Sequence, residues 1–151
     1  MSEALHVLVL HGPNLGDLGR REPARYGNVT LDALDQRLRA RGEALGCVVT
    51  CVQSDSEAVL AQVLRDARGW AGGVVFNPGG LTHTSVVLRD AVLASTLPTV
   101  ECHVTHTDAR EPFRRRSMIA PACVARVSGF GWQSYLLALE GLVARLRGEG
   151  A

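Results

Sequence analysis

Two residues at the end of one apolar segment have the types and the spacing of an acid–base pair. Glu101 and His103 are two positions apart, so on a β-strand their side chains project from the same face. A carboxylate beside an imidazole fixes the tautomer of the ring and favours its protonated form, which suits the histidine to donate a proton. From these residues alone, the pair is either such an acid or a structural pair at a strand end.

A second candidate lies in the long segment between Leu10 and Thr30. It contains Asn14, Arg21 and Tyr26. A neighbouring guanidinium favours the phenolate, so an Arg–Tyr pair can provide a base that removes a carbon-bound proton. A packed tyrosine near a solvated arginine would have the same pattern. Connections of this length are typical of lids, and we expect a lid at about residues 18–28.

Two further polar segments are candidates for binding a substrate. Asn77-Pro78-Gly79-Gly80 is followed by His83, and the next helix is expected to begin at residue 84 or 85, where its free amide groups suit an anion. An ordinary glycine turn is the alternative. Arg110 and Arg114 have the spacing of one helical face and could bind an anionic or polyhydroxylated substrate, or they belong to a basic surface turn.

The composition excludes several mechanisms. The chain has 151 residues and a formal net charge of +1, and all 16 of its basic residues are arginine. Without lysine, no Schiff base can form on a carbonyl substrate, pyridoxal phosphate has no anchor, and a P-loop lacks its lysine. The near-neutral charge does not favour nucleic acid as a partner.

The apolar runs and the cysteines indicate the cellular location of the protein. The longest apolar run, residues 7–10, is too short to span a membrane, and no secretory signal is recognisable. We therefore expect a cytoplasmic protein that does not bind membranes. Cys47, Cys51, Cys102 and Cys123 should be free thiols that pack as small hydrophobic side chains, and because no CxxC pair exists, no metal site is expected.

Strand-like and helix-like patterns alternate along the chain. Strands are expected at 5–10, 47–52, 73–77, 99–103 and 122–128, and helices after the N-caps Thr30 and Ser56, at 84–95 and at 132–147. This pattern predicts a single α/β domain over residues 1–151, a flavodoxin-like three-layer sandwich with a five-stranded parallel sheet of order 2-1-3-4-5. Ligands should bind beyond the carboxyl ends of the first and third strands.

Two other proteins with this topology do not fit the sequence. A receiver domain needs a phosphorylatable aspartate where Asn77 stands, and a later lysine. A flavodoxin has a hydroxyl-rich phosphate loop after its first strand, whereas residues 11–16 contain neither serine nor threonine.

Several segments taken together resemble one family, the type II 3-dehydroquinate dehydratases, or type II dehydroquinases. The resemblance runs in order over nearly the whole chain. Its segments are Val7–Leu15, Arg21-Glu22-Pro23 with Tyr26-Gly27, Gln53–Glu57, Asn77–Gly80, Thr82–Ser85, Leu88–Ala91, Glu101-Cys102-His103, Ala109–Arg114, Ser128–Gly131 and Ser134–Leu139.

The resemblance implies dehydration of 3-dehydroquinate to 3-dehydroshikimate by anti elimination through an enolate, without a metal or an organic cofactor. The reaction would serve the shikimate pathway or quinate breakdown. Tyr26 would remove the proton alpha to the ketone, with Arg21 stabilising its phenolate. Asn14 would help to hold the water that stabilises the enolate oxygen. His103, oriented by Glu101, would protonate the departing hydroxyl.

The resemblance also implies binding residues and an assembly. The substrate would be bound by Asn77, His83, Val104, Thr105 and Arg114, and Arg110 would be associated with the lid. Asp90 would reach the active site of a neighbouring subunit, since the family forms dodecamers of four trimers. No partner other than the substrate and further copies of the chain is implied.

Three positions depart from the usual family pattern. His11 stands where the family usually has the first asparagine of Asn-Gly-Pro-Asn, Thr105-His106 replaces Ser-Asn, and Asp108 stands where histidine is common. The alternatives are a related hydro-lyase or isomerase acting on another cyclic hydroxy acid, and a catalytically silent flavodoxin-like domain that binds a small molecule.

Overall fold

The predicted parallel sheet is present in the computed structural model, which describes residues 4–149. The five strands have the order β2-β1-β3-β4-β5, and every neighbouring pair is parallel. The flavodoxin-like order is therefore confirmed. The strands are β1 (Leu5–His11), β2 (Cys47–Gln53), β3 (Gly73–Asn77), β4 (Thr99–His103) and β5 (Ala125–Ser128).

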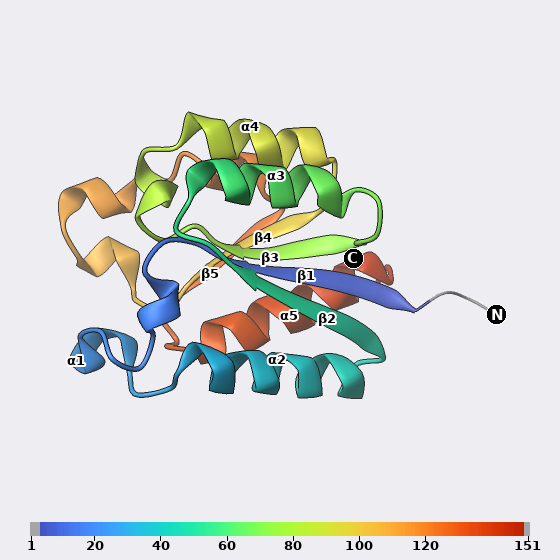
Figure 1. The fold of residues 1–151 in the computed structure, drawn as a ribbon, viewed down its shortest axis with the longest axis horizontal. Helices are drawn as coiled ribbons and strands as arrows, with labels where there is room; N and C mark the ends of the chain where they lie inside the picture. Colours follow the sequence, from blue (N-terminus) through green and yellow to red (C-terminus); the bar gives the residue numbers. More distant parts are fainter. Residues whose placement is uncertain (1–3, 150–151) are drawn as a thin grey trace.

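Helices cover both faces of the sheet (Figure 1), with α2 and α5 on one face and α3 and α4 on the other. Alternate residues of β1 enter the two cores: Val7 packs in the core under α2 and α5, and Leu8 in the core under α3 and α4. Because both faces are buried, the central residues of the strand, 7–10, are all apolar. The helices are α1 (Pro23–Tyr26), α2 (Leu31–Ala44), α3 (Glu57–Ala67), α4 (Val86–Ser95) and α5 (Gln133–Leu146).

Side-chain caps set the starts of three helices. The hydroxyls of Thr30, Ser56 and Ser85 accept hydrogen bonds from backbone amides three residues later, which satisfies donors that would otherwise be unpaired. The predicted caps of α2 and α3 are thus confirmed. The helix expected from residue 84 begins at Val86 instead, because the preceding residues, Gly79–His83, form the 3₁₀ helix η2.

Two local predictions were wrong, and a proline interrupts the chain in each case. β5 begins at Ala125 and not at residue 122, because residues 120–122 form a 3₁₀ turn that contains Pro121. Arg110 and Arg114 do not share a helical face. Pro112 opens a separate 3₁₀ helix, Pro112–Arg115, because it has no amide hydrogen with which to continue a helix from Arg110.

The four cysteines are free, as expected. Cys47 and Cys102 are buried, whereas Cys51 and Cys123 are half-buried, and Cys123 precedes β5 instead of lying within it. Among residues 4–149, no helix has the length and apolar character needed to cross a membrane.

Candidate active site

A small polar cavity lies where the loops after β1, β3 and β4 meet, at the left end of the sheet in Figure 1. Its volume is about 170 Å³. Every predicted site residue except Glu101 and Asp90 lines it. The lining residues are Pro13, Asn14, Leu15, Arg21, Tyr26, Asn77, Gly79, Gly80, His83, His103, Val104, Thr105, Thr107, Arg110 and Arg114.

Two glycines let the loops after β1 and β3 pack directly on each other. A Cβ atom on Gly12 would lie 2.6 Å from the backbone of Pro78, and Gly79 has a positive φ of 60° with the carbonyl of Pro13 close by. Larger residues cannot adopt this arrangement without a shift of the backbone. The close approach brings Asn14 and Asn77 to the same cavity.

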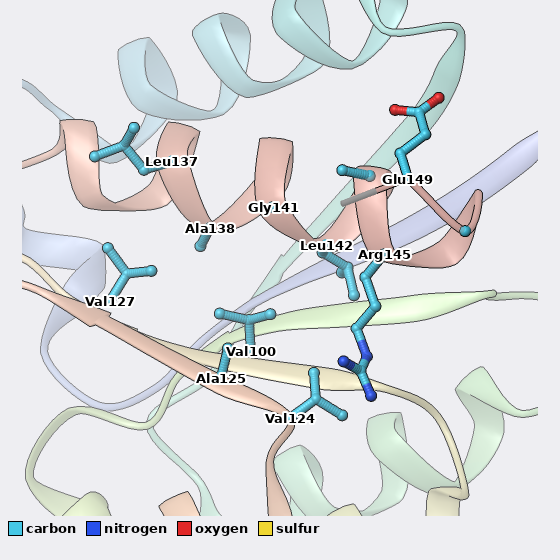
Figure 2. Close-up of a pocket in the computed structure, with 12 residues that line it drawn as sticks. Val100, Val124, Ala125, Val127, Leu137, Ala138, Gly141, Leu142, Arg145 and Glu149 are labelled. Atoms are coloured by element: carbon cyan, nitrogen blue, oxygen red, sulfur yellow. The ribbon is translucent and has the colours of Figure 1, made fainter. Parts of the chain in front are cut away.

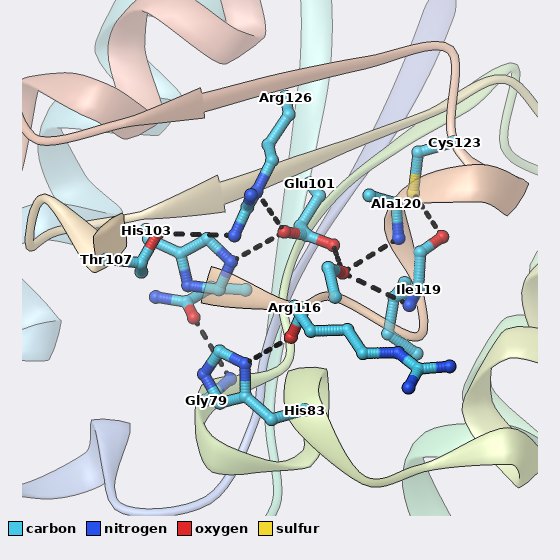
Figure 3. Close-up of polar contacts among 12 residues, drawn as sticks. Gly79, His83, Glu101, His103, Thr107, Arg116, Ile119, Ala120, Cys123 and Arg126 are labelled. Carbon is cyan, nitrogen blue, oxygen red and sulfur yellow. Dashed lines mark hydrogen bonds and ion pairs between the residues drawn. The ribbon is translucent and has the colours of Figure 1, made fainter. Parts of the chain in front are cut away.

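The imidazole of His103 is held by Glu101 behind it (Figure 3). Nε2 of His103 lies 2.8 Å from Oε2 of Glu101, and the two side chains are 7% and 0% exposed. Because a carboxylate accepts, Nε2 carries the donated proton and Nδ1 is the other nitrogen of the ring. The predicted orientation of His103 by Glu101 therefore has a direct geometric basis.

Arg126 and Ser117 complete the surroundings of Glu101 and were not predicted from the sequence. Nε of Arg126, on the adjacent strand β5, lies 2.6 Å from Oε2, and the hydroxyl of Ser117 donates to Oε1. Burial alone would raise the pKa of Glu101, but the hydrogen bonds and charges of His103, Ser117 and Arg126 outweigh it and lower that pKa. Glu101 is therefore ionised at neutral pH. An arginine in an otherwise apolar strand was the available sequence signal for Arg126.

Two arginines surround Tyr26, and they contact different parts of it. Nη1 of Arg110 donates to the hydroxyl of Tyr26 at 3.0 Å and also to Oγ1 of Thr105 at 3.3 Å. The guanidinium of Arg21 lies 4.8 Å from the centre of the tyrosine ring, in a cation–π contact. The sequence singled out Arg21 as the arginine that neighbours Tyr26, and the structure places Arg21 at the ring and Arg110 at the hydroxyl.

His83 and Arg114 supply a neutral and a charged group to the cavity. Nδ1 of His83 donates to the carbonyl of Arg116 at 2.8 Å, so in the neutral ring Nε2 is the acceptor. Burial lowers the pKa of His83, and the nearby His103 and Arg114 act in the same direction, so the ring is neutral at neutral pH. Arg114 is paired with Glu111 at 2.6 Å.

The charges that line the cavity favour an anionic ligand. Arg21, Arg110 and Arg114 contribute three positive charges, whereas Glu111 is the carboxylate near them, with a pKa lowered chiefly by the hydrogen bond from Arg114. Arginine forks bind carboxylates with paired hydrogen bonds. The cavity therefore suits a small molecule that carries a carboxylate and hydroxyl groups.

Asp90 and a second, apolar hollow lie away from this cavity. Asp90 is exposed on α4 and does not line the cavity. A larger groove of about 610 Å³ lies between α5 and the edge strand β5 (Figure 2), but most of its lining is apolar and it contains none of the predicted site residues. Because proton transfer needs polar side chains, the candidate active site is the cavity at the strand ends and not this groove.

The comparisons with known proteins agree with this geometry. The family model described as "Dehydroquinase class II" matches residues 5–143. A protein of Desulforudis audaxviator named 3-dehydroquinate dehydratase is 53% identical over 139 residues, which is 92% of this chain and 93% of that protein. Another of that name, from Parasynechococcus marenigrum, is 48% identical over 97% of this chain and 100% of its own length.

A solved structure leads to the same family. The type II dehydroquinase of Propionibacterium acnes superposes with a TM-score of 0.90 at 37% identity, covering 95% of this chain and 99% of that chain. The matched segments contain the polar cavity with its tyrosine, arginines and histidines. This chain belongs to the class II dehydroquinase family.

Proposed function

We propose that this protein is a type II 3-dehydroquinate dehydratase, which eliminates water from 3-dehydroquinate to give 3-dehydroshikimate. The observation that carries the proposal is that one cavity holds two groups suited to proton transfer. Tyr26 is contacted by the guanidinium groups of Arg110 and Arg21, and His103 is hydrogen-bonded to Glu101. The family relationship supports the same reaction.

Tyr26 is the proposed base. Its phenolate takes the proton from the carbon next to the ketone, and the electrons of the broken C–H bond form an enolate. Arg110 at the hydroxyl and Arg21 at the ring favour the negative charge on this oxygen. Asn14 holds a water that donates to the enolate oxygen.

His103 is the proposed acid. The enolate electrons re-form the ketone and the new carbon–carbon double bond, and the C–O bond of the departing hydroxyl breaks. His103 gives that oxygen the proton on Nδ1, so that it leaves as water. Glu101 keeps Nε2 protonated and stabilises the imidazolium before transfer.

The remaining cavity residues bind the substrate in this proposal. The amide of Asn77, the ring of His83, the backbone at Val104 and Thr105, and the guanidinium of Arg114 take the carboxylate and hydroxyls. With Arg110 and Arg21 nearby, the carboxylate enters a positively charged site. The reaction needs only groups of the protein and one water, so the proposal includes no metal or organic cofactor.

The proposal extends to the assembly and the setting of the enzyme. As the family resemblance implies, the chain works as a single catalytic domain in a dodecamer of four trimers, in which Asp90 on α4 reaches the site of a neighbouring subunit. The exposed position of Asp90 leaves it available for such a contact. The segment at residues 18–28 acts as a lid, and the enzyme serves the shikimate pathway or quinate breakdown in the cytoplasm.

The direct test mixes the purified protein with 3-dehydroquinate and follows the ultraviolet absorbance of the conjugated enone product. We expect a steady rise that depends on enzyme concentration. No rise at high enzyme concentration, with substrate still bound in a titration, would instead identify a silent binding domain. Sedimentation of the active protein tests the assembly, since a fully active monomer contradicts the role proposed for Asp90.

A further inference from the structure

A line of buried polar side chains leads from the active-site cavity into the core under α2 and α5. Nδ2 of Asn77 lies 2.9 Å from the hydroxyl of Tyr135, which lies 2.9 Å from Nδ1 of His11. Nε2 of His11 lies 2.8 Å from Oδ1 of Asp35. We refer to these four residues as the Asn77–Asp35 chain. They come from β3, α5, β1 and α2.

The Asn77–Asp35 chain is buried over nearly all its length. His11 and Tyr135 are 0% exposed, Asn77 is 3% exposed, and the Asp35 side chain is 13% exposed. Buried polar groups are costly unless each one has a hydrogen-bond partner. The hydrogen bonds within the chain are therefore the means by which these groups are accommodated, and the loss of one member leaves its neighbour unpaired.

The direction of each hydrogen bond follows from the end at the cavity. The backbone amide of Gly79 donates to Oδ1 of Asn77 at 3.1 Å, so the NH₂ end of this side chain faces Tyr135 and donates to its oxygen. The single hydroxyl proton of Tyr135 then goes to Nδ1 of His11. That nitrogen is an acceptor, so the ring proton is on Nε2 and is donated to Asp35.

The surroundings agree with this assignment of protons. Burial raises the pKa of Tyr135 well above its ordinary value, so the phenol keeps its proton. Burial, then the charge of Asp35 and a hydrogen bond to it, raise the pKa of the Cys51 thiol. A protonated thiol is a second donor to the Asp35 carboxylate. With this assignment, every member of the chain has a hydrogen-bond partner.

We propose that His11 is a positioning residue which, through Tyr135 and with Asp35 holding its tautomer, sets the orientation of the Asn77 amide toward the substrate. This inference rests on the proposed function, in which Asn77 contacts the substrate. If His11 carried its proton on Nδ1, the oxygen of Tyr135 would face two donors, and the proton of its own hydroxyl would lose its acceptor. To give that proton an acceptor, the Asn77 amide would have to turn its oxygen toward Tyr135, which would take this oxygen away from the Gly79 amide.

The departure of this chain from the usual family residue gives the first test. Asparagine has an oxygen at about the distance of Nδ1 from the backbone, so it can accept from Tyr135 but is too short to reach Asp35. We expect His11→Phe, which offers Tyr135 no acceptor, to raise KM about tenfold with a smaller change in kcat. His11→Asn should restore KM to within about threefold of the original value.

A double-mutant comparison separates positioning from general stability. Asp35→Leu should raise KM several-fold in the otherwise unchanged protein, but cause no further rise in a Tyr135→Phe background, where the chain is already cut. Asp32→Leu is the matched control, because Asp32 is an exposed aspartate on the same helix. Additive effects of Asp35→Leu and Tyr135→Phe, or an unchanged KM in His11→Phe, would overturn the proposal.

The tautomer of His11 can be measured without turnover. In ¹⁵N-labelled protein, we expect the ring shifts of His11 to show a neutral imidazole with its proton on Nε2, and Asp35→Leu to abolish that preference. A proton on Nδ1 in the unchanged protein would contradict the proposal. If the protein fails to convert 3-dehydroquinate, the proposed function fails, while the tautomer result still decides whether the chain is arranged as inferred.

Discussion

Arg110 donates a hydrogen bond to the hydroxyl of Tyr26, with 3.0 Å between Nη1 and Oη. The tyrosine lies in the segment after β1 and the arginine in the segment after β4, so this contact joins the proposed lid to the opposite wall of the cavity. An ion pair of 3.6 Å between Arg25 and Glu111 joins the same two segments. The proposed base is thus positioned by residues distant from it in the chain.

Replacement of the proposed base should remove proton abstraction. We expect Tyr26→Phe to lower kcat by about 10²–10⁴-fold, the usual size of a general-base contribution, and to change KM much less. Steady-state kinetics and exchange of the alpha proton of the substrate with solvent are the measurements. Exchange at the normal rate in Tyr26→Phe would mean that another group is the base.

Arg110 should matter to the chemistry because it contacts the hydroxyl itself. Arg110→Met removes a hydrogen bond that becomes charge-assisted when the phenolate forms, and such bonds contribute about 1.5–3 kcal/mol. We therefore expect kcat to fall by roughly 10–100-fold. Arg115→Met is the control, since Arg115 is exposed and does not line the cavity. Equal losses in the two variants would argue against a specific role for Arg110.

The acid role of His103 can be separated from a role in binding. His103→Ala should lower kcat by about 10²–10⁴-fold, while an inhibitor that mimics the enolate binds with nearly unchanged affinity, because the enolate precedes the proton transfer from His103. Turnover assays and calorimetric titration of the inhibitor are the two measurements. An equal loss of turnover and of inhibitor binding is the result that would assign His103 to binding instead.

The lowered pKa of Glu101 predicts a pH dependence of stability. A carboxyl group whose pKa is lower in the folded than in the unfolded state stabilises the fold above the unfolded value, and loses that contribution as pH falls through the folded value. With an ordinary value of 4.5, the contribution of Glu101 is full at neutral pH and declines below 4.5.

Glu101→Gln tests this dependence. It should lower the free energy of unfolding by about 1–3 kcal/mol at neutral pH, because Arg126 and His103 lose a charged partner. The difference from the unchanged protein should shrink in denaturation curves recorded at successively lower pH below 4.5. If the difference in the free energy of unfolding stays constant across this pH range, the charge of Glu101 does not contribute to the stability of the fold.

Two glycine substitutions should have opposite effects on stability. Gly12→Ala places a methyl group 2.6 Å from the backbone of Pro78, so it should destabilise the fold by about 1–3 kcal/mol and reduce activity. Gly141 lies in α5, and a methyl group added there would have open space around it. Gly141→Ala should therefore stabilise the fold by about 0.5–1 kcal/mol. Thermal unfolding of both variants is the measurement, and a stable Gly12→Ala would disprove the close approach.

Much of the fold was predictable because its signals are local. The cap hydroxyl of Thr30 lies three residues from the amide it accepts, and Glu101 and His103 are two residues apart on one strand. The apolar runs of the central strands β1 and β3 reflect burial on both faces, which led to the parallel order. The prolines at positions 112 and 121 were the local signals that would have corrected the misplaced helix and strand boundaries.

The sequence by itself determined the residue types and the set of loops that form the site, and with no lysine present it excluded an imine route. Only the tertiary structure decided which arginine meets the hydroxyl of Tyr26, because Arg110 is 84 residues away. It likewise paired Arg126 with Glu101 across adjacent strands and joined His11 to Tyr135, 124 residues apart. Such contacts depend on strand register and on helix packing, which bring distant residues together and leave no periodic pattern in the sequence.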